Sequence, residues 1–310
     1  MLKKKIYIYT FYRFKNLKNI NHIKTKLDKF SKDKLILGTV LIAEEGINGT
    51  ISGGKSNLDL FITNIKKILK IKKLSLKISK NQFIPFYRLK IRLKKEIVTL
   101  GDKLIKPEEV CGKHIQPRDW DKIINDKSYL IIDTRNNYEV NIGTFKNSFN
   151  PNMKSFRDFP KHIKDINMDK KQPIAMFCTG GIRCEKASSF LINNGFKNVS
   201  QLDGGVLNYL EYKKNKKINT WIGECFVFDN RVSVDKNLNK GSHDQCYGCR
   251  HPITENDKKL DSYIKGASCK YCIKEKTKEK LDSSLIRQEQ IDLAEKRKKT
   301  HSFQKIFSIK

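Results

Sequence analysis

The chain lacks the features that would place it in a membrane or on a secretory route. Nowhere in its 310 residues does an apolar run approach the roughly 20 residues that a membrane-spanning helix needs. The apolar segment Ile6–Tyr12 is cut short by Arg13 and Lys15, and no small-residue cleavage site follows, so it is not typical of a signal peptide. We therefore expect no membrane partner and a cytoplasmic location.

Acidic residues are also scarce. Asp and Glu number 33 against 64 Lys and Arg, which gives a formal net charge of +31. Such an excess favours a polyanionic partner, because cations that contact phosphates release condensed counterions. Lys, Ile and Asn are abundant together, however, and a biased genome produces the same composition. Charge alone leaves an RNA partner and an ordinary solvated surface both open.

Motifs for the usual redox cofactors are missing as well. The sequence contains no dinucleotide fingerprint, no flavin motif and no two-His-one-carboxylate iron pattern. We therefore recognise no cofactor for a redox step. The sequence has no internal repeats, and its length favours about two domains.

Four of the eight cysteines form two close pairs instead of an evenly spaced disulfide framework. The pairs are Cys246/Cys249 and Cys269/Cys272, separated by residues 250–268. Paired Cys-x-x-Cys motifs are typical of tetrahedral zinc sites. We expect these four thiols to bind a structural zinc ion, with reduced free thiols as the alternative. His243 precedes the first pair, and we interpret it as a surface residue.

Residues 1–100 predict one α+β domain. Apolar periodicity gives the order strand, helix, strand, strand, helix, strand, strand, which fits a ferredoxin-like α+β sandwich. Leu35–Ala43 and Ile47–Ser52 predict a hairpin, and Ser56 followed by Asp59 predicts a helix start.

The last strand of this domain carries a row of basic residues. Arg88, Lys90 and Arg92 alternate with apolar residues and should share one face of the strand. This face is either an RNA-contacting surface or a solvated outer surface of the sheet, and the pattern leaves both open.

The rest of the chain predicts a linker, a second domain and a tail. Residues 101–116 are interpreted as the linker. In residues 117–220, short apolar strands alternate with helical intervals, which predicts a parallel α/β sheet with its site at the carboxyl ends of the strands. Residues 221–275 form the cysteine-rich segment. Residues 276–310 form a charged tail that is either a solvated helix or disordered, with a basic end suited to RNA.

The segment Cys178-Thr-Gly-Gly-Ile-Arg183 is the strongest candidate site. It joins the apolar strand Pro173–Phe177 to a helix expected over Glu185–Asn194, so Cys178 falls on a short loop. Free amides and the helix dipole favour a thiolate there, and Arg183 adds a fixed cation. The remaining loop residues are Thr179, Gly180, Gly181 and Ile182, and the two glycines allow backbone conformations that are closed to other residues. A buried structural cysteine is the alternative.

This loop resembles the active loop of rhodanese domains, in which the cysteine carries sulfur as a persulfide. Upstream, Asp133-Thr-Arg135 with Glu139 resembles the first rhodanese signature, although Thr144 stands where that family often has His. The resemblance implies a rhodanese-type fold, a persulfide on Cys178 beside Arg183, and supporting roles for Asp133 and Arg135. Cys184 is either a packing residue or a thiol that resolves the persulfide.

Three segments together resemble one narrower family, the bacterial rhodanese-domain tRNA uridine hydroxylases. They are Ala43–Thr50, Cys178–Ala187 and Cys225–Asp229. The resemblance implies oxygen-dependent conversion of the wobble uridine, position 34, to 5-hydroxyuridine. Cys178 would be the catalytic residue, molecular oxygen the co-substrate and a tRNA anticodon stem-loop the partner, with no DNA expected. A thiosulfate-type sulfurtransferase and a non-enzymatic RNA-binding module are the alternatives.

Overall fold

A computed structural model describes residues 6–166, 168–216 and 219–297 of the chain. Its first domain contains β1 (Ile6–Phe14), α1 (Ile20–Ser31), β2 (Ile36–Ala43), β3 (Gly46–Gly53), α2 (Lys55–Leu69), β4 (Ser75–Asn81) and β5 (Leu89–Leu93). These strands form one sheet in the order β4-β1-β3-β2-β5. The first four strands have the predicted ferredoxin-like arrangement, with β1 antiparallel to both β3 and β4. β5 extends the sheet parallel to β2.

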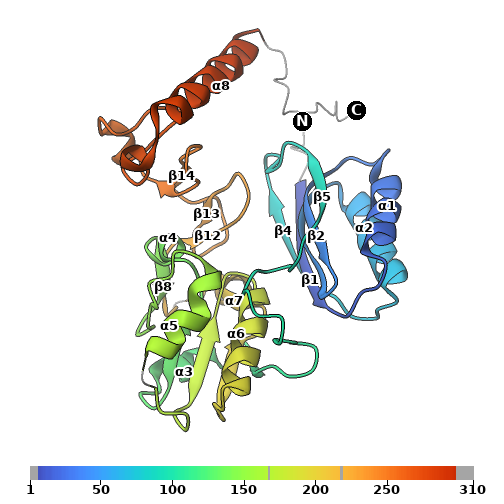
Figure 1. The fold of residues 1–310 in the computed structure, drawn as a ribbon, viewed down its shortest axis with the longest axis vertical. Helices are drawn as coiled ribbons and strands as arrows, with labels where there is room; N and C mark the ends of the chain where they lie inside the picture. The colour runs from blue at the N-terminus through green and yellow to red at the C-terminus, as the bar shows by residue number, and fades with distance from the viewer. Residues whose placement is uncertain (1–5, 167, 217–218, 298–310) are drawn as a thin grey trace.

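The two helices cover only one face of this sheet (Figure 1). Phe11, Val40 and Ile51 point from the strands into a core that Leu27 and Phe61 complete from α1 and α2. The other face is turned toward the rest of the chain (Figure 1). The predicted hairpin is confirmed, but α2 begins at Lys55 after Gly54, not at the Ser56 signal, and no side-chain cap is present.

The second domain is built around a four-stranded parallel sheet in the order β6-β10-β9-β7. Its elements are β6 (Lys113–Ile115), α3 (Trp120–Asn125), β7 (Leu130–Asp133), α4 (Asn137–Val140), β8 (Gly143–Phe145), the 3-10 helix η1 (Phe156–Asp158), α5 (Phe159–Asp165), β9 (Ile174–Phe177), α6 (Ile182–Asn193), β10 (Val199–Leu202) and α7 (Gly205–Lys213). The parallel α/β prediction is confirmed. β6 falls within the segment expected to be a linker, because its three residues pair with β10.

The cysteine-rich segment contains short two-stranded pieces. Its elements are β11 (Trp221–Gly223), β12 (Cys225–Phe226), β13 (Ser233–Val234), β14 (Asp244–Gln245), β15 (Pro252–Ile253), and the 3-10 helices η2 (Asp257–Lys259) and η3 (Ile273–Glu275). β11 pairs with β8, which ties the start of this segment to the second domain.

The tail is helical as far as the structure describes it. Helix α8 (Lys278–Lys296) extends away from the two domains (Figure 1). The basic end expected at the C-terminus, residues 298–310, lies outside the described residues. Among the helices in the described ranges, none combines the length and apolar character required to cross a membrane.

Candidate functional site

The Cys178 loop is a tight turn between β9 and α6. Helix α6 begins at Ile182, earlier than the expected Glu185, so Arg183 and Cys184 belong to its first turn. Gly181 makes this possible, because it precedes the helix with φ of 98°. Gly180 has no such requirement: its φ is outside the left-handed range, and an added Cβ would meet nothing within 4 Å. The prediction of a conformational need at Gly180 was therefore wrong.

The surroundings of Cys178 stabilise a thiolate. Its Sγ accepts a hydrogen bond from the amide of Gly181 at 3.0 Å. Burial would raise the pKa of this thiol, but a hydrogen bond from Cys184, the charge of Arg183 and the helix amides together lower the pKa below its ordinary value. Burial raises the pKa of Cys184, so Cys184 remains the protonated donor of the pair.

Arg183 is held in place by Glu139. Its two terminal nitrogens bond the two carboxylate oxygens at 2.6 and 2.7 Å, and Thr179 donates to the same carboxylate at 3.2 Å. Glu139 is fully buried. Burial would raise its pKa, but Arg183 lowers the pKa and keeps the carboxylate ionised. The cation beside Cys178 therefore has a fixed position.

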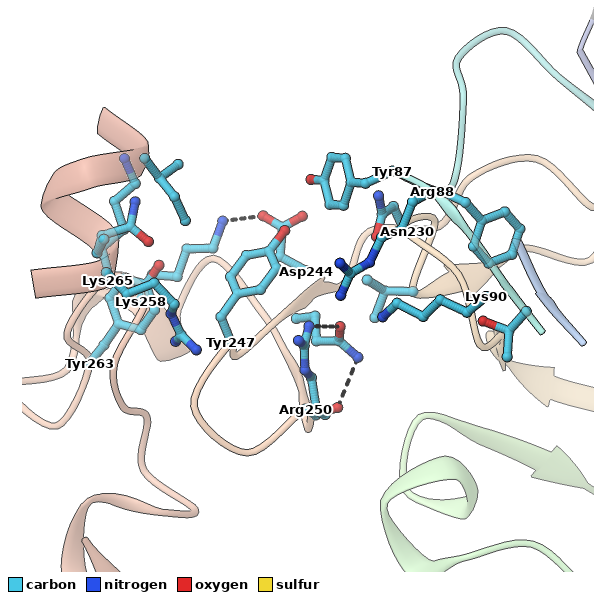
Figure 2. Close-up of a pocket in the computed structure, with 17 residues that line it drawn as sticks. Tyr87, Arg88, Lys90, Asn230, Asp244, Tyr247, Arg250, Lys258, Tyr263 and Lys265 are labelled. Carbon is cyan, nitrogen blue, oxygen red and sulfur yellow. Dashed lines mark hydrogen bonds and ion pairs between the residues drawn. The ribbon is translucent and has the colours of Figure 1, made fainter. Parts of the chain in front are cut away.

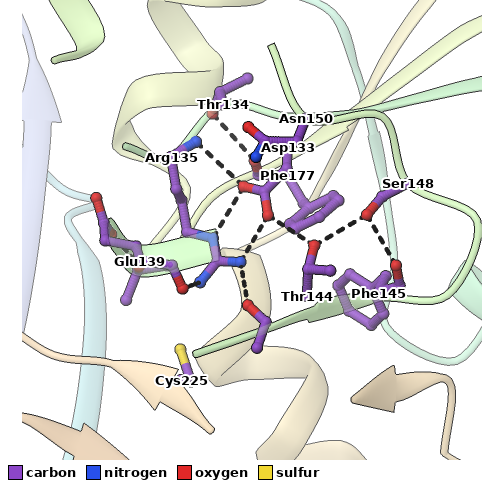
Figure 3. A network of polar contacts seen from close by, with 12 residues as sticks. Asp133, Thr134, Arg135, Glu139, Thr144, Phe145, Ser148, Asn150, Phe177 and Cys225 are labelled. Atoms are coloured by element: carbon purple, nitrogen blue, oxygen red, sulfur yellow. Dashed lines mark hydrogen bonds and ion pairs between the residues drawn. The ribbon is translucent and has the colours of Figure 1, made fainter. Parts of the chain in front are cut away.

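Asp133 and Arg135 form a second buried ion pair, drawn in Figure 3. The guanidinium bonds both oxygens of Asp133 at 2.9 and 2.6 Å and donates to the backbone carbonyl of Gly143. Thr144 donates to the same carboxylate at 2.8 Å, so in this chain a hydroxyl serves where the rhodanese pattern often has His. Arg135 also donates to the backbone carbonyl of Glu139 at 3.4 Å, which helps to fix the position of Glu139. Within the described residues, neither member of the pair forms a hydrogen bond or ion pair with Cys178.

Helix α6 also carries the contacts that join the two domains. Lys186 is fully buried and its ammonium lies 2.7 Å from Glu45 and 2.6 Å from Glu96. Beside it, Glu185 accepts a hydrogen bond from Tyr12 of β1 at 2.9 Å. A buried cation between two carboxylates needs all three partners in position. These contacts hold the open face of the first sheet over the Cys178 loop.

A cavity of about 620 Å³ lies between that sheet face and the loop. The three segments that resemble the hydroxylase family all contribute to its lining. Asn48 and Thr50 come from the first segment, Cys178 from the second and Phe228 from the third. Thr10 and Thr39, the strand neighbours of Thr50, line it as well. The size and the mixed polar and apolar lining are typical of a ligand site.

A second cavity, of about 700 Å³, is rich in basic and aromatic side chains (Figure 2). Arg88 and Lys90 enter it from the β5 side. Figure 2 shows Tyr247 and Arg250 of the cysteine-rich segment facing them. The pKa of Lys90 is lowered, by burial first and then by Arg88, Arg92 and Arg250. Arg92 is exposed and outside this lining, so only two of the three predicted basic residues are brought into it.

The two cavities are neighbours. Thr39 and Phe86 line both of them. The two cavities therefore share part of their walls.

The four cysteines of the pairs are brought together. All four sulfurs lie within 4.8 Å of one another, with Cys246 and Cys272 4.0 Å apart and Cys249 and Cys269 3.7 Å apart. A tetrahedral ion with Zn–S bonds of about 2.3 Å spaces its sulfurs about 3.8 Å apart, so the donor set fits zinc. His243 is not in this group and bonds Glu224 instead.

The fold and this site define a rhodanese-domain protein with an acylphosphatase-like domain in front. Residues 6–97 match the family model of the UPF0176 acylphosphatase like domain, and residues 116–212 match that of the Rhodanese-like domain. A curated relative from Pelagibacter ubique (strain HTCC1062), named tRNA uridine(34) hydroxylase, is 48% identical over 301 residues, which cover 97% of this chain and 99% of the relative. The chain belongs to this tRNA uridine(34) hydroxylase family.

Solved structures resemble one part of the chain. A rhodanese-related protein from Thermoplasma volcanium is 25% identical, covering 32% of this chain and 92% of its own, with a TM-score of 0.28. A rhodanese-like domain protein from Staphylococcus aureus is 22% identical, covering 31% of this chain and 90% of its own, with a TM-score of 0.27.

Several residues of the site were missed by the sequence analysis. Glu139 was noted as part of a signature but given no role, and Lys186 and Asn48 lay in recognised segments without an assigned function. Each acts through a partner far away in the chain. The local pattern of apolar residues does not reveal such a partner. The one available signal was a lysine, Lys186, at a position of the predicted helix that faces the core, since a buried charge requires a partner.

Proposed function

We propose that this protein hydroxylates the uridine at position 34 of tRNA to 5-hydroxyuridine, with molecular oxygen as co-substrate and Cys178 as the catalytic residue. The observation that carries the proposal is the single cavity in which the three family segments meet around Cys178. The name of the 48% identical relative supports the same substrate. Such an enzyme would work in the cytoplasm, with its tRNA.

Cys178 would act as a sulfur nucleophile on the uracil ring. Its sulfur anion, either the thiolate or the outer atom of a persulfide, adds to C6, and the electron pair moves to C5 and the C4 carbonyl. C5 then bonds to molecular oxygen, and the outer oxygen takes up a proton to give a hydroperoxide. Two thiols of an external reductant then reduce that hydroperoxide to a hydroxyl, which releases water and forms one disulfide between the two thiols. Loss of the C5 proton and of the sulfur anion restores the ring double bond.

Over the cycle, one oxygen atom enters the base and the other leaves as water. The two electrons come from the external thiols, so Cys178 is regenerated. Arg183 and the loop amides hold the sulfur anion before attack and after release.

The basic cavity would bind the anticodon stem-loop. Arg88 and Lys90 supply charge for phosphates, and Tyr247 and Arg250 add flat groups on which unpaired bases stack. Arg92, exposed on the same strand, would extend the contact. Because the two cavities share Thr39 and Phe86, an unstacked base next to the bound strand has a short path to Cys178.

The four-cysteine cluster would hold a structural zinc ion. Cys246, Cys249, Cys269 and Cys272 match the spacing and donor type of a closed site with no open position for chemistry. The ion would fix the turn that carries Tyr247 and Arg250, which makes it a support for RNA binding.

The test uses a stem-loop with uridine at position 34, the same stem-loop with cytidine there, and ¹⁸O₂ in place of air. The uridine substrate alone should gain one labelled oxygen, and only with a thiol reductant present. The Cys178 loop also suits sulfur transfer, so transfer from thiosulfate to cyanide is measured on the same protein. Rapid sulfur transfer with no labelled nucleoside would replace the hydroxylase by a sulfurtransferase.

A further inference from the structure

The open face of the first sheet carries a row of polar side chains directly over the Cys178 loop. Thr10, Thr50 and Thr39 are register neighbours on β1, β3 and β2, and Asn48 lies two residues before Thr50 on the same face of β3. All four line the cavity that contains Cys178. Asn48 and Thr50 belong to the segment Ala43–Thr50, to which the proposed chemistry assigns no task.

We propose that Asn48 reads the uracil base in this cavity, accepting a hydrogen bond from N3–H and donating one to O4. The inference rests on the proposed function and names the residue that would give that site its base specificity.

The orientation of the Asn48 amide is fixed by the main chain. Its Nδ2 donates to the carbonyl oxygen of Ile97 at 3.0 Å, and only the nitrogen of the amide can do so. The backbone of Ile97 is itself held on its other side, because the Ile97 N–H donates to Glu45 at 2.6 Å and Glu45 is paired with the buried Lys186. Asn48 is therefore anchored through two bonds to the contact between the domains.

The anchored amide leaves one edge for a ligand. One N–H donates to Ile97, and the second N–H and the carbonyl oxygen have no hydrogen-bond partner among the described residues. An amide edge with one donor and one acceptor complements the N3–H and O4 of uracil. Cytosine presents the reverse pattern, an N3 acceptor and an amino donor, which an amide with fixed orientation does not match.

The same cavity offers a surface for the face of the base. Phe228 lines it and is 61% exposed, which is unusual for a large apolar side chain beside a cavity. The guanidinium of Arg183 lies 5.8 Å from the centre of its ring, so the ring is held beside the Cys178 loop. Stacking on Phe228 would set the plane of the base, and Asn48 would set its rotation within that plane.

The contact would also assist the reaction. When sulfur adds to C6, negative charge develops on O4, and a donor already aimed at O4 stabilises that charge without reorganisation. Removing one such donor lowers turnover by about 100- to 1,000-fold in known cases.

The experiment compares stem-loops with uridine, 3-methyluridine or cytidine at position 34, in binding and in turnover, for the wild type and Asn48→Ala. The wild type should prefer uridine to 3-methyluridine by about tenfold or more, since methylation removes the N3 donor. Asn48→Ala should lose at least about a hundredfold in uridine turnover and treat the two bases alike. Asn198→Ala is the matched control, because Asn198 also bonds a backbone carbonyl but is exposed outside the cavity.

The decisive quantity is the ratio of turnover, and of affinity, between the uridine and the 3-methyluridine stem-loops. If Asn48 only anchors Ile97, its loss lowers activity on every substrate and leaves the ratio unchanged, which overturns the inference. A wild type that binds uridine and 3-methyluridine equally overturns it too. If the wild type discriminates in binding through Asn48 but never hydroxylates, the base-reading role stands and the proposed reaction fails.

Discussion

The chain contains two cysteine sites, the Cys178 loop and the four-cysteine cluster, and the groups around the sulfur atoms differ between them. Cys178 lies in the turn before the N-terminus of α6, close to Arg183, and its sulfur lines a cavity. In the cysteine-rich segment, four sulfurs lie within 4.8 Å of one another. The first arrangement stabilises one anion and leaves room for a substrate. The second arrangement fills its space with donors and suits an ion that closes it.

The difference teaches that surroundings, not residue type, divide reactive from structural cysteines. Cys111 is an example of a cysteine whose surroundings disfavour the thiolate. Burial raises its pKa to about 11, and the nearby Glu185 adds to the effect. A thiol beside a carboxylate is a poor nucleophile at neutral pH, whereas a thiol beside Arg183 is a good one.

The largest expected effect comes from removing the reactive sulfur. Cys178→Ser should reduce hydroxylation at least about a thousandfold, because the side chain keeps its shape and loses its nucleophilicity. The variant should remain folded, and its zinc content should match that of the wild type. Nucleoside mass analysis of tRNA from cells that lack the gene and carry the variant checks this. Restoration of 5-hydroxyuridine by the serine variant would show that the catalytic assignment is wrong.

The next effect comes from breaking the other sulfur site. The wild type should copurify with about one zinc ion per chain, and the double variant Cys249→Ser, Cys272→Ser should lose it. Stem-loop affinity should then fall about tenfold as Tyr247 and Arg250 lose their fixed position. Elemental analysis and binding at constant salt measure both.

Two comparisons make that experiment specific. Persulfide formation on Cys178 from thiosulfate should be unaffected in the double variant, since the loop shares no ligand with the cluster. Cys111→Ser, outside both sites, should keep the ion. Metal-free wild-type protein prepared without chelators, with normal RNA affinity, would contradict the zinc proposal.

A smaller loss of turnover than that of Cys178→Ser is expected at Arg183. Arg183→Ala should lower turnover by roughly 10- to 100-fold while the loop amides still hold part of the charge. It should also destabilise the fold by about 3–5 kcal/mol, because Glu139 remains buried and unpaired.

A double variant separates the two consequences. Arg183→Met with Glu139→Gln removes both charges, so stability should return while turnover stays low. If turnover returns as well, Arg183 serves only as the partner of Glu139.

Much of the fold could be predicted from local pattern. Alternating strands and helical periodicity predicted the ferredoxin-like order of the first domain, and the alternation of apolar strands with helical intervals predicted the parallel sheet of the second. The early start of α6 at Ile182 was not predicted, since it depends on Gly181 adopting a positive φ. β6 was missed because its three residues are too few to show an alternation of apolar and polar side chains. The strand is defined only by its pairing with β10.

The candidate site was predictable in its parts but not in its assembly. The residues of the Cys178 loop and the four metal candidates could be named, because their spacing along the chain is local. The cavity depends on the ion pairs of Lys186 with Glu45 and Glu96, and on the hydrogen bond from Asn48 to the Ile97 carbonyl, which sets the orientation of the Asn48 amide. These contacts join segments that no short-range rule connects.

The smallest effect is a shift in the ionisation of Cys178. The ultraviolet absorbance of thiolate, taken as the difference between wild type and Cys178→Ser, should titrate below the ordinary thiol pKa of about 8.5. Since the folded pKa is the lower one, ionisation stabilises the fold above the unfolded pKa, and the gain is lost as pH falls through the folded pKa. The pKa of Cys178 should be unchanged in the double variant Cys249→Ser, Cys272→Ser, whereas Arg183→Ala should raise this pKa. A wild-type titration at or above pH 8.5 would mean that burial outweighs Arg183 and the amides, and that the two sulfur sites differ less than their surroundings imply.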